Sequence, residues 1–148
     1  METIAVFVND ARYAQHLLAP LLQGAPPTHW IVVACAPRLT RHIGRWVSSR
    51  AREQWRERWA AELFAQLEPE IKAQHGSRVE KILAKRPLVA VSSRLKARLA
   101  EVRLLDARMP RWGKPEEPLT DAQPALQPQW AGPLAVTTGL SAMLALVD

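Results

Sequence analysis

Short apolar runs alternate with longer segments of helical periodicity over the first 107 residues of the chain. The apolar runs are rich in β-branched residues, which is typical of strands buried in a parallel sheet. The run at 78–85 differs because it contains Glu80, Lys81 and Lys85, and such charges are typical of a strand at a sheet edge. The alternation predicts an α/β fold, a three-layer Rossmann-like domain with a mainly parallel sheet. In chain order the predicted elements are strand 3–8, helix 11–23, strand 30–36, helix 41–74, strand 78–85, helix 87–99 and strand 101–107.

The predicted helix at 41–74 is unusually long. Its apolar residues recur every four positions and so form a single stripe, which consists of Ile43, Val47, Ala51, Trp55, Trp59, Leu63, Leu67 and Ile71. Trp46, Ala60 and Phe64 widen this stripe, so the face is expected to pack against a large flat surface. A sheet cannot cover a helix of this length completely, and we expect the N-terminal part of the helix to project beyond it.

The chain divides into an α/β core at 1–108, a proline-rich loop or arm at 109–133 and an apolar C-terminal segment at 134–148. Six of the twelve prolines lie in the arm, where they remove backbone donors and hold their preceding residues extended. The C-terminal segment is almost uncharged, so we expect it to complete the same domain or to form the interface of a homodimer.

Charge and cysteine content narrow the function classes. The chain has 148 residues and a formal net charge of +6, carried mostly by arginine, which suits an anionic ligand or an acidic partner. Cys35 is the only cysteine and no secretion signal or membrane span is recognised, so a cytoplasmic protein is expected. No motif for a metal, a P-loop or a catalytic triad is present in the sequence, and an enzyme is the least supported class.

The order and lengths of the elements resemble the universal stress protein family. The first strand runs into Asn9-Asp10, where that family typically has an Asp. The second strand closes on Ala36-Pro37 before a long second helix, and Lys85-Arg86-Pro87-Leu88 is similar to the family's turn after its third strand. ATP-binding members carry the glycine motif G-x2-G-x9-G-[ST] after the fourth strand, whereas this region holds only Gly113 and Gly132, at another spacing. The resemblance implies strand order 3-2-1-4(-5), with a fifth strand at 144–147, and a protein that does not use ATP in the usual way.

That strand order places one candidate site where the order of the strands reverses. Asn9 and Asp10 would lie on one side of it, with Asp106 and Arg108 on the other and Arg38 nearby. Asn9 or Asp10 could bind a ribose or a base of ATP or AMP, and either arginine could hold a phosphate. The simpler alternative, which we favour, is that Asn9 or Asp10 only caps the first helix.

The start of the long helix is a second candidate, for partner binding, and comprises Arg41, Arg45, Trp46, Arg50 and Arg52. Cations oppose the macrodipole at a helix N-terminus, which suggests an anion or an acidic partner nearby. Arginine and tryptophan side chains can also bind nucleic acid, through phosphate contacts and through stacking on bases. The simpler alternative is tryptophan in the core or a dimer seam, covered by arginine stems.

The sequence therefore leaves three possible functions. The first is a stress-related or regulatory protein, similar to universal stress proteins, that acts by binding and has no predicted cofactor. The second is a nucleotide-binding protein with a non-standard phosphate site. The third is binding of nucleic acid or of an acidic protein through the arginine-rich helix.

Overall fold

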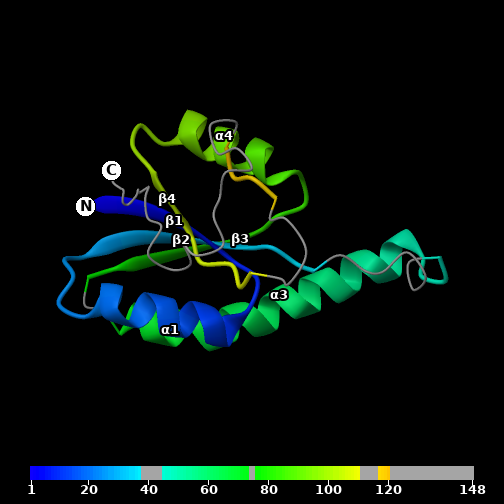
Figure 1. The fold of residues 1–148 in the computed structure, drawn as a ribbon, viewed down its shortest axis with the longest axis horizontal. Coiled ribbons are helices and arrows are strands. Elements are labelled where there is room, and N and C mark those ends of the chain that lie inside the picture. The colour runs from blue at the N-terminus through cyan, green and yellow to red at the C-terminus, as the bar shows by residue number, and fades with distance from the viewer. Residues whose placement is uncertain (38–44, 74–75, 111–116, 121–148) are drawn as a thin grey trace.

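Four parallel strands form one sheet with helices on both faces (Figure 1). The computed structural model describes residues 1–37, 45–73, 76–110 and 117–120. The described elements are β1 (Glu2–Val8), α1 (Ala11–Leu22), β2 (Thr28–Ala34), α3 (Ser49–Lys72), β3 (Arg78–Leu83), α4 (Leu88–Arg98) and β4 (Arg103–Asp106). The strand order is β3-β2-β1-β4, as predicted, and every neighbouring pair is parallel.

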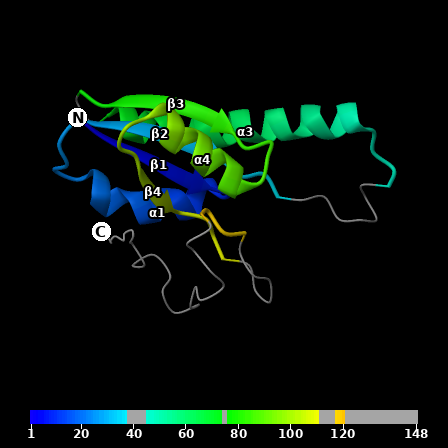
Figure 2. The same cartoon turned by 90° about the horizontal axis from the view of Figure 1, so that it is seen from above.

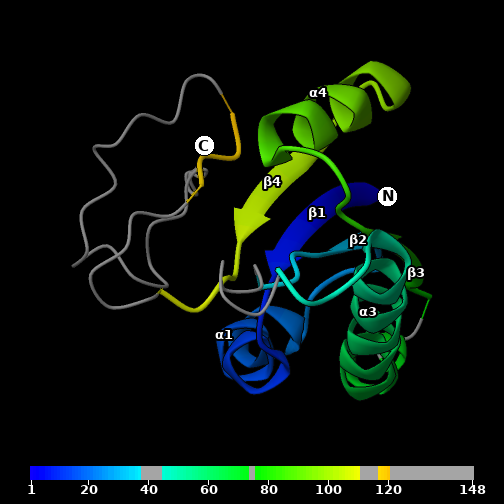
Figure 3. The ribbon, with the colours of Figure 1, turned by 90° about the vertical axis from the view of Figure 1, so that its right-hand side faces the viewer.

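The side chains of the central strands alternate between two hydrophobic layers. Val6 and Val8 face α1 and α3, while Ala5 and Phe7 face α4 on the opposite side of the sheet. Figure 3 shows α1 and α3 side by side below the sheet and α4 above it. Because both faces are covered, β1 from Ala5 onward and β2 from Trp30 onward contain no polar residue, which is why they appear in the sequence as unbroken apolar runs.

The edge position predicted for the third strand is confirmed. β3 pairs only with β2 among the described strands, and its charged side chains turn outward. Glu80 binds Arg98 of α4 through a 2.8 Å ion pair, and Lys81 binds Glu68 of α3 at 3.1 Å. The charges therefore connect the edge strand to both helical layers.

Several predicted boundaries need correction, above all the start of the long helix. The helix begins at Ser49 and not at Arg41, because the Ser48 hydroxyl accepts a 3.1 Å hydrogen bond from the Ala51 N–H and so caps it. The apolar spacing that suggested an earlier start continues through Val47, but residues 45–47 form a turn. The helix ends at Lys72, before the predicted Gln74. β2, β3 and β4 also end one to two residues before their predicted limits.

The buried part of α3 is its C-terminal half. Ala60, Leu63, Leu67 and Ile71 belong to the hydrophobic cluster beneath the sheet, with Trp59 packed at its margin. Figure 2 shows the N-terminal half of the helix extending past the ends of the strands. The predicted projection of this helix beyond the sheet is therefore present.

Two predicted segments lie wholly or mostly outside the described residues. These are the C-terminal segment at 134–148, with its expected fifth strand, and the arm at 109–133 except for residues 109–110 and 117–120. No described helix combines the length and the apolar character that a membrane span requires.

Truncation of Leu67 tests the layer between α3 and the sheet. Leu67 is 2% exposed, so Leu67→Ala removes buried methyl groups and leaves a cavity; we expect the free energy of unfolding to fall by about 2–5 kcal/mol. Leu21→Ala is the matched control because Leu21 is 47% exposed, and it should change stability by less than about 1 kcal/mol. Urea denaturation followed by circular dichroism measures both. Equal losses in the two variants would contradict this packing.

Candidate functional site

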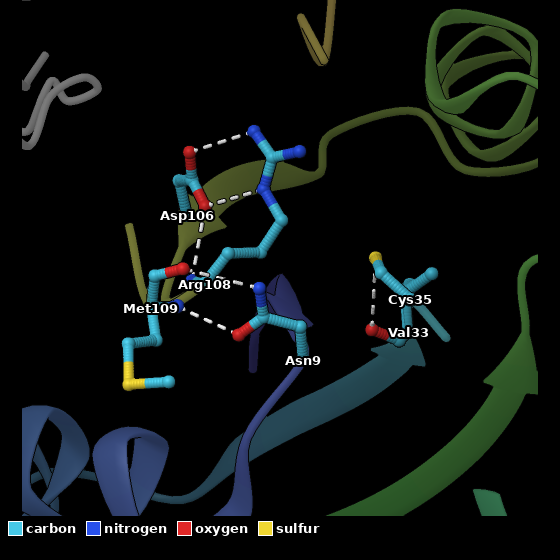
Figure 4. A network of polar contacts seen from close by, with 6 residues as sticks. All are labelled: Asn9, Val33, Cys35, Asp106, Arg108 and Met109. Carbon is cyan, nitrogen blue, oxygen red and sulfur yellow. Dashed lines mark hydrogen bonds and ion pairs between the residues drawn. The ribbon is translucent and has the colours of Figure 1, made fainter. Parts of the chain in front are cut away.

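The carboxyl ends of β1 and β4 lie side by side at the point where the strand order reverses. β1 pairs with β2 on one side and with β4 on the other, and the register joins Phe7 to Asp106. The polar residues that follow these strands therefore meet at one edge of the sheet (Figure 4). This is the place where open α/β sheets usually bind ligands.

Asn9 connects the two loops that leave β1 and β4. Its side-chain Nδ2 donates to the carbonyl oxygen of Met109 at 3.2 Å, and its Oδ1 accepts from the Met109 N–H at 2.7 Å. The amide of Asn9 thus pairs with a backbone unit as a neighbouring strand would, across 100 residues of sequence. One N–H of its Nδ2 and one lone pair of its Oδ1 are thus engaged within the protein.

Asp10 caps α1. Its Oδ1 accepts a 2.9 Å hydrogen bond from the N–H of Tyr13, and its backbone is extended, as is usual for the residue before a helix. The capping role weighed for this residue in the sequence is therefore present in the structure.

Asp106 and Arg108 form a close pair at the end of β4. The Arg108 Nε and Nη2 donate to the two carboxylate oxygens of Asp106 at 2.9 and 3.0 Å, and the Arg108 backbone N–H donates to Oδ1 at 3.1 Å. The Arg108 side chain is only 5% exposed and that of Asp106 22%. A buried guanidinium needs such a partner because an unpaired charge is expensive to remove from water. The arginine predicted to hold a phosphate is thus bound to the chain's own carboxylate.

Cys35 lies beside this pair, just after β2. Its thiol is oriented toward the Val33 carbonyl oxygen at 3.7 Å, and it packs against the hydrophobic cluster under α4. Burial raises the pKa of the thiol to about 12, although the cation of Arg108 acts in the opposite direction. Since a thiol is nucleophilic as the thiolate, Cys35 behaves here as a small apolar residue.

Sequence reasoning missed a contact made by the proline-rich arm. The Glu117 carboxylate accepts a 2.7 Å hydrogen bond from the N–H of Leu88, in the first turn of α4. The residue before this helix is Pro87, whose side chain offers no acceptor, so the cap comes from a residue 29 positions away. Leu119 is 3% exposed within the cluster under α4. An acidic and an apolar residue two positions apart among prolines are the only sequence signal of this docking.

The second candidate site comprises the turn at residues 45–47 and the start of α3. Arg45, Trp46 and Arg50 are exposed, and Trp46 is 78% exposed. Arg52 is half-buried, and its Nη2 donates to the Val47 carbonyl oxygen at 3.3 Å. The structure therefore places Trp46 in water, and not in a core beneath arginine stems.

Arg38 and Arg41, the remaining predicted site residues, lie outside the described part of the chain. Within the described ranges, no group of three His, Cys, Asp or Glu side chains could hold a metal ion. No family model, no curated protein and no solved structure matches this chain.

Removal of Asp106 tests the buried pair. Asp106→Ala leaves the Arg108 guanidinium buried without this carboxylate, and we expect a loss of about 3–5 kcal/mol in the free energy of unfolding. The double variant Asp106→Leu/Arg108→Met removes both charges and should lose less than the single variant. Denaturant titration of the three proteins measures this. A loss below about 1 kcal/mol in Asp106→Ala would show that the carboxylate does not hold Arg108 in place.

The reactivity of Cys35 tests the environment of its thiol. With its pKa raised from 9.0 to about 12, the folded protein should hold far less thiolate at pH 8 than the unfolded chain does. We expect iodoacetamide to label Cys35 at least about 100-fold more slowly in the folded protein than in urea. Mass spectrometry follows the labelling, with Cys35→Ser as the unlabelled control. Equal rates in both conditions would mean that the thiol is open to solvent.

Proposed function

We propose that this protein is a divergent cytoplasmic relative of the universal stress proteins that acts by binding a partner and does not use a nucleotide at the sheet edge. One observation carries the proposal: Asn9, Asp10, Asp106 and Arg108, the candidate nucleotide-binding residues that the structure describes, make hydrogen bonds within the protein. Asn9 is occupied by Met109, and Arg108 by Asp106. Asp10 serves as a helix cap.

Among the described residues, the loop after β4 offers a nucleotide phosphate few donors. Phosphate sites in α/β folds use backbone N–H groups that glycine brings close to the ligand. Here β4 is followed by Ala107, Arg108, Met109 and Pro110: the Ala107 N–H donates to the Phe7 carbonyl oxygen, those of Arg108 and Met109 are bound to Asp106 and Asn9, and proline has no N–H. Phosphate binding by Arg108 would require the buried pair of Asp106 and Arg108 to separate, at several kcal/mol.

The strand order β3-β2-β1-β4 supports the relation to universal stress proteins, although other doubly wound folds share it. Support for binding elsewhere comes from α3. Arg50 and Arg58 in its N-terminal half are exposed, as is Trp46 in the turn before the helix, whereas the side chains at the sheet edge make hydrogen bonds within the protein. The partner surface is accordingly assigned to the projecting helix.

Calorimetric titration with ATP and with AMP tests the proposal. We expect no binding tighter than about 1 mM, because each candidate contact must first break an internal one. Arg108→Gln is the companion variant. If the wild-type protein binds either nucleotide at micromolar concentration and Arg108→Gln does not, the protein has a non-standard phosphate site and the proposal is wrong.

A further inference from the structure

The part of α3 that projects from the sheet exceeds what the fold requires. A 24-residue helix is about 36 Å long, whereas the seven residues of β2 span about 23 Å. The difference corresponds to roughly nine residues, and the first buried residue of the helix is Ala60. We refer to residues 45–58, which precede the buried half, as the overhang.

The overhang is strongly basic. It contains five arginines against two glutamates: Arg45, Arg50, Arg52, Arg56, Arg58, Glu53 and Glu57. Arg45, Arg50 and Arg58 are exposed and form no ion pair with any other described residue. The first turn of the helix holds no acidic residue, so the positive end of the macrodipole adds to the same field.

Lys85 engages both glutamates of the overhang. Its Nζ lies 2.8 Å from Glu53 Oε2 and 3.5 Å from Glu57 Oε2. This hydrogen bond lowers the pKa of Glu53, which therefore stays ionised and bound to Lys85. Lys85, from the loop after β3, balances one of these two negative charges, so the five arginines of the overhang remain in clear excess.

Trp46 is the only large hydrophobic residue of the overhang that is exposed, among those the structure describes. Protein–protein interfaces have an apolar centre from which charged residues are depleted, and one tryptophan among arginines does not supply such a centre. Binding of single-stranded nucleic acid needs another combination, which is an aromatic face for a base and cations for the phosphates. A duplex offers no free base face to a tryptophan, since its bases are stacked on one another.

We propose that the overhang binds single-stranded nucleic acid, with Trp46 stacking on a base and with Arg45, Arg50 and Arg58 neutralising phosphates. This inference rests on the proposed function, since it names the partner of a protein that acts by binding outside the sheet edge. The negative backbone complements the overhang along its length. Sequence preference is expected to be weak, because stacking is available to every base.

Fluorescence anisotropy with a labelled oligothymidine and the full chain tests the charge contacts. We expect affinity to fall as salt rises, with a slope of log K against log salt of about −2 for three phosphates. Arg45→Gln with Arg50→Gln should flatten this slope by about 1.4. The control is Arg94→Gln with Lys96→Gln, which removes the same charge from exposed positions on α4 and should leave the slope unchanged. Equal flattening in both pairs would overturn the assignment to the overhang.

Substitution of Trp46 tests the stacking. Trp46→Ala should weaken oligothymidine binding by about 5- to 150-fold, the range measured for one stacked base. Trp46→Phe keeps an aromatic face and should retain most of the affinity. Because Trp46 is 78% exposed, thermal unfolding should be the same in all three proteins. Unchanged binding by Trp46→Ala would overturn the role of the ring.

Competition for the labelled oligothymidine complex distinguishes single-stranded nucleic acid from a duplex and from an acidic protein as the partner. Unlabelled oligothymidine should displace the probe, while a duplex of equal length and polyglutamate should do so at much higher concentration. If polyglutamate competes as well as oligothymidine does, the partner is an acidic protein. If the duplex competes as well as oligothymidine does, Trp46 does not stack on a base. Either result, or the absence of a complex at low salt, overturns the inference. A different result would contradict the proposed function. That result is micromolar binding of ATP or AMP by the wild-type protein and loss of this binding in Arg108→Gln.

Discussion

The parallel pairing of β1 with strands on both sides is the constraint on which the rest of the structure depends. β1 lies between β2 and β4, and its residues from Ala5 to Val8 are completely buried. Parallel neighbours cannot be joined by a tight turn, so each strand must be followed by a crossover, here a helix on one face of the sheet or the other. The same pairing brings the loops after β1 and β4 together. The position of β1 therefore brings Asn9, Asp106 and Arg108 together at one edge of the sheet.

Much of this fold could be predicted because burial on two faces leaves a clear pattern. The runs around Val6 and Val32 contain almost no polar residue, and the charges of β3 mark its edge position. The start of α3 could not be placed in the same way. Its apolar spacing continues upstream of Ser48, and the signal that ends it is a single hydroxyl that caps the helix. Short-range hydrogen bonds of this kind set boundaries that a periodicity cannot show.

The sequence predicts where the candidate site lies, but not whether its side chains are free to bind a ligand. Topology places Asn9, Asp106 and Arg108 at one edge, and the structure brings them there. Whether they face a ligand or one another depends on distances of about an ångström, which residue types and spacing do not determine. The cap that Glu117 provides for α4 is a stronger case, because it joins positions 29 residues apart through a proline-rich segment. No local pattern predicts such a contact.

The overhang of α3, unlike the sheet edge, contributes little to the packing of the fold. Ordering the backbone of a residue costs about 1–2 kcal/mol, and most helices offset this by burying an apolar face. The first turns of α3 bury little: Ala51 and Glu53 are exposed, and the helix reaches the core only at Ala60. Their described contacts include the cap of Ser48 and the ion pairs of Glu53 and Glu57 with Lys85. These contacts leave Arg50 and Arg58 exposed. The first turns of α3 therefore contribute mainly to the surface that the protein presents, whereas the residues from Ala60 onward contribute to its core.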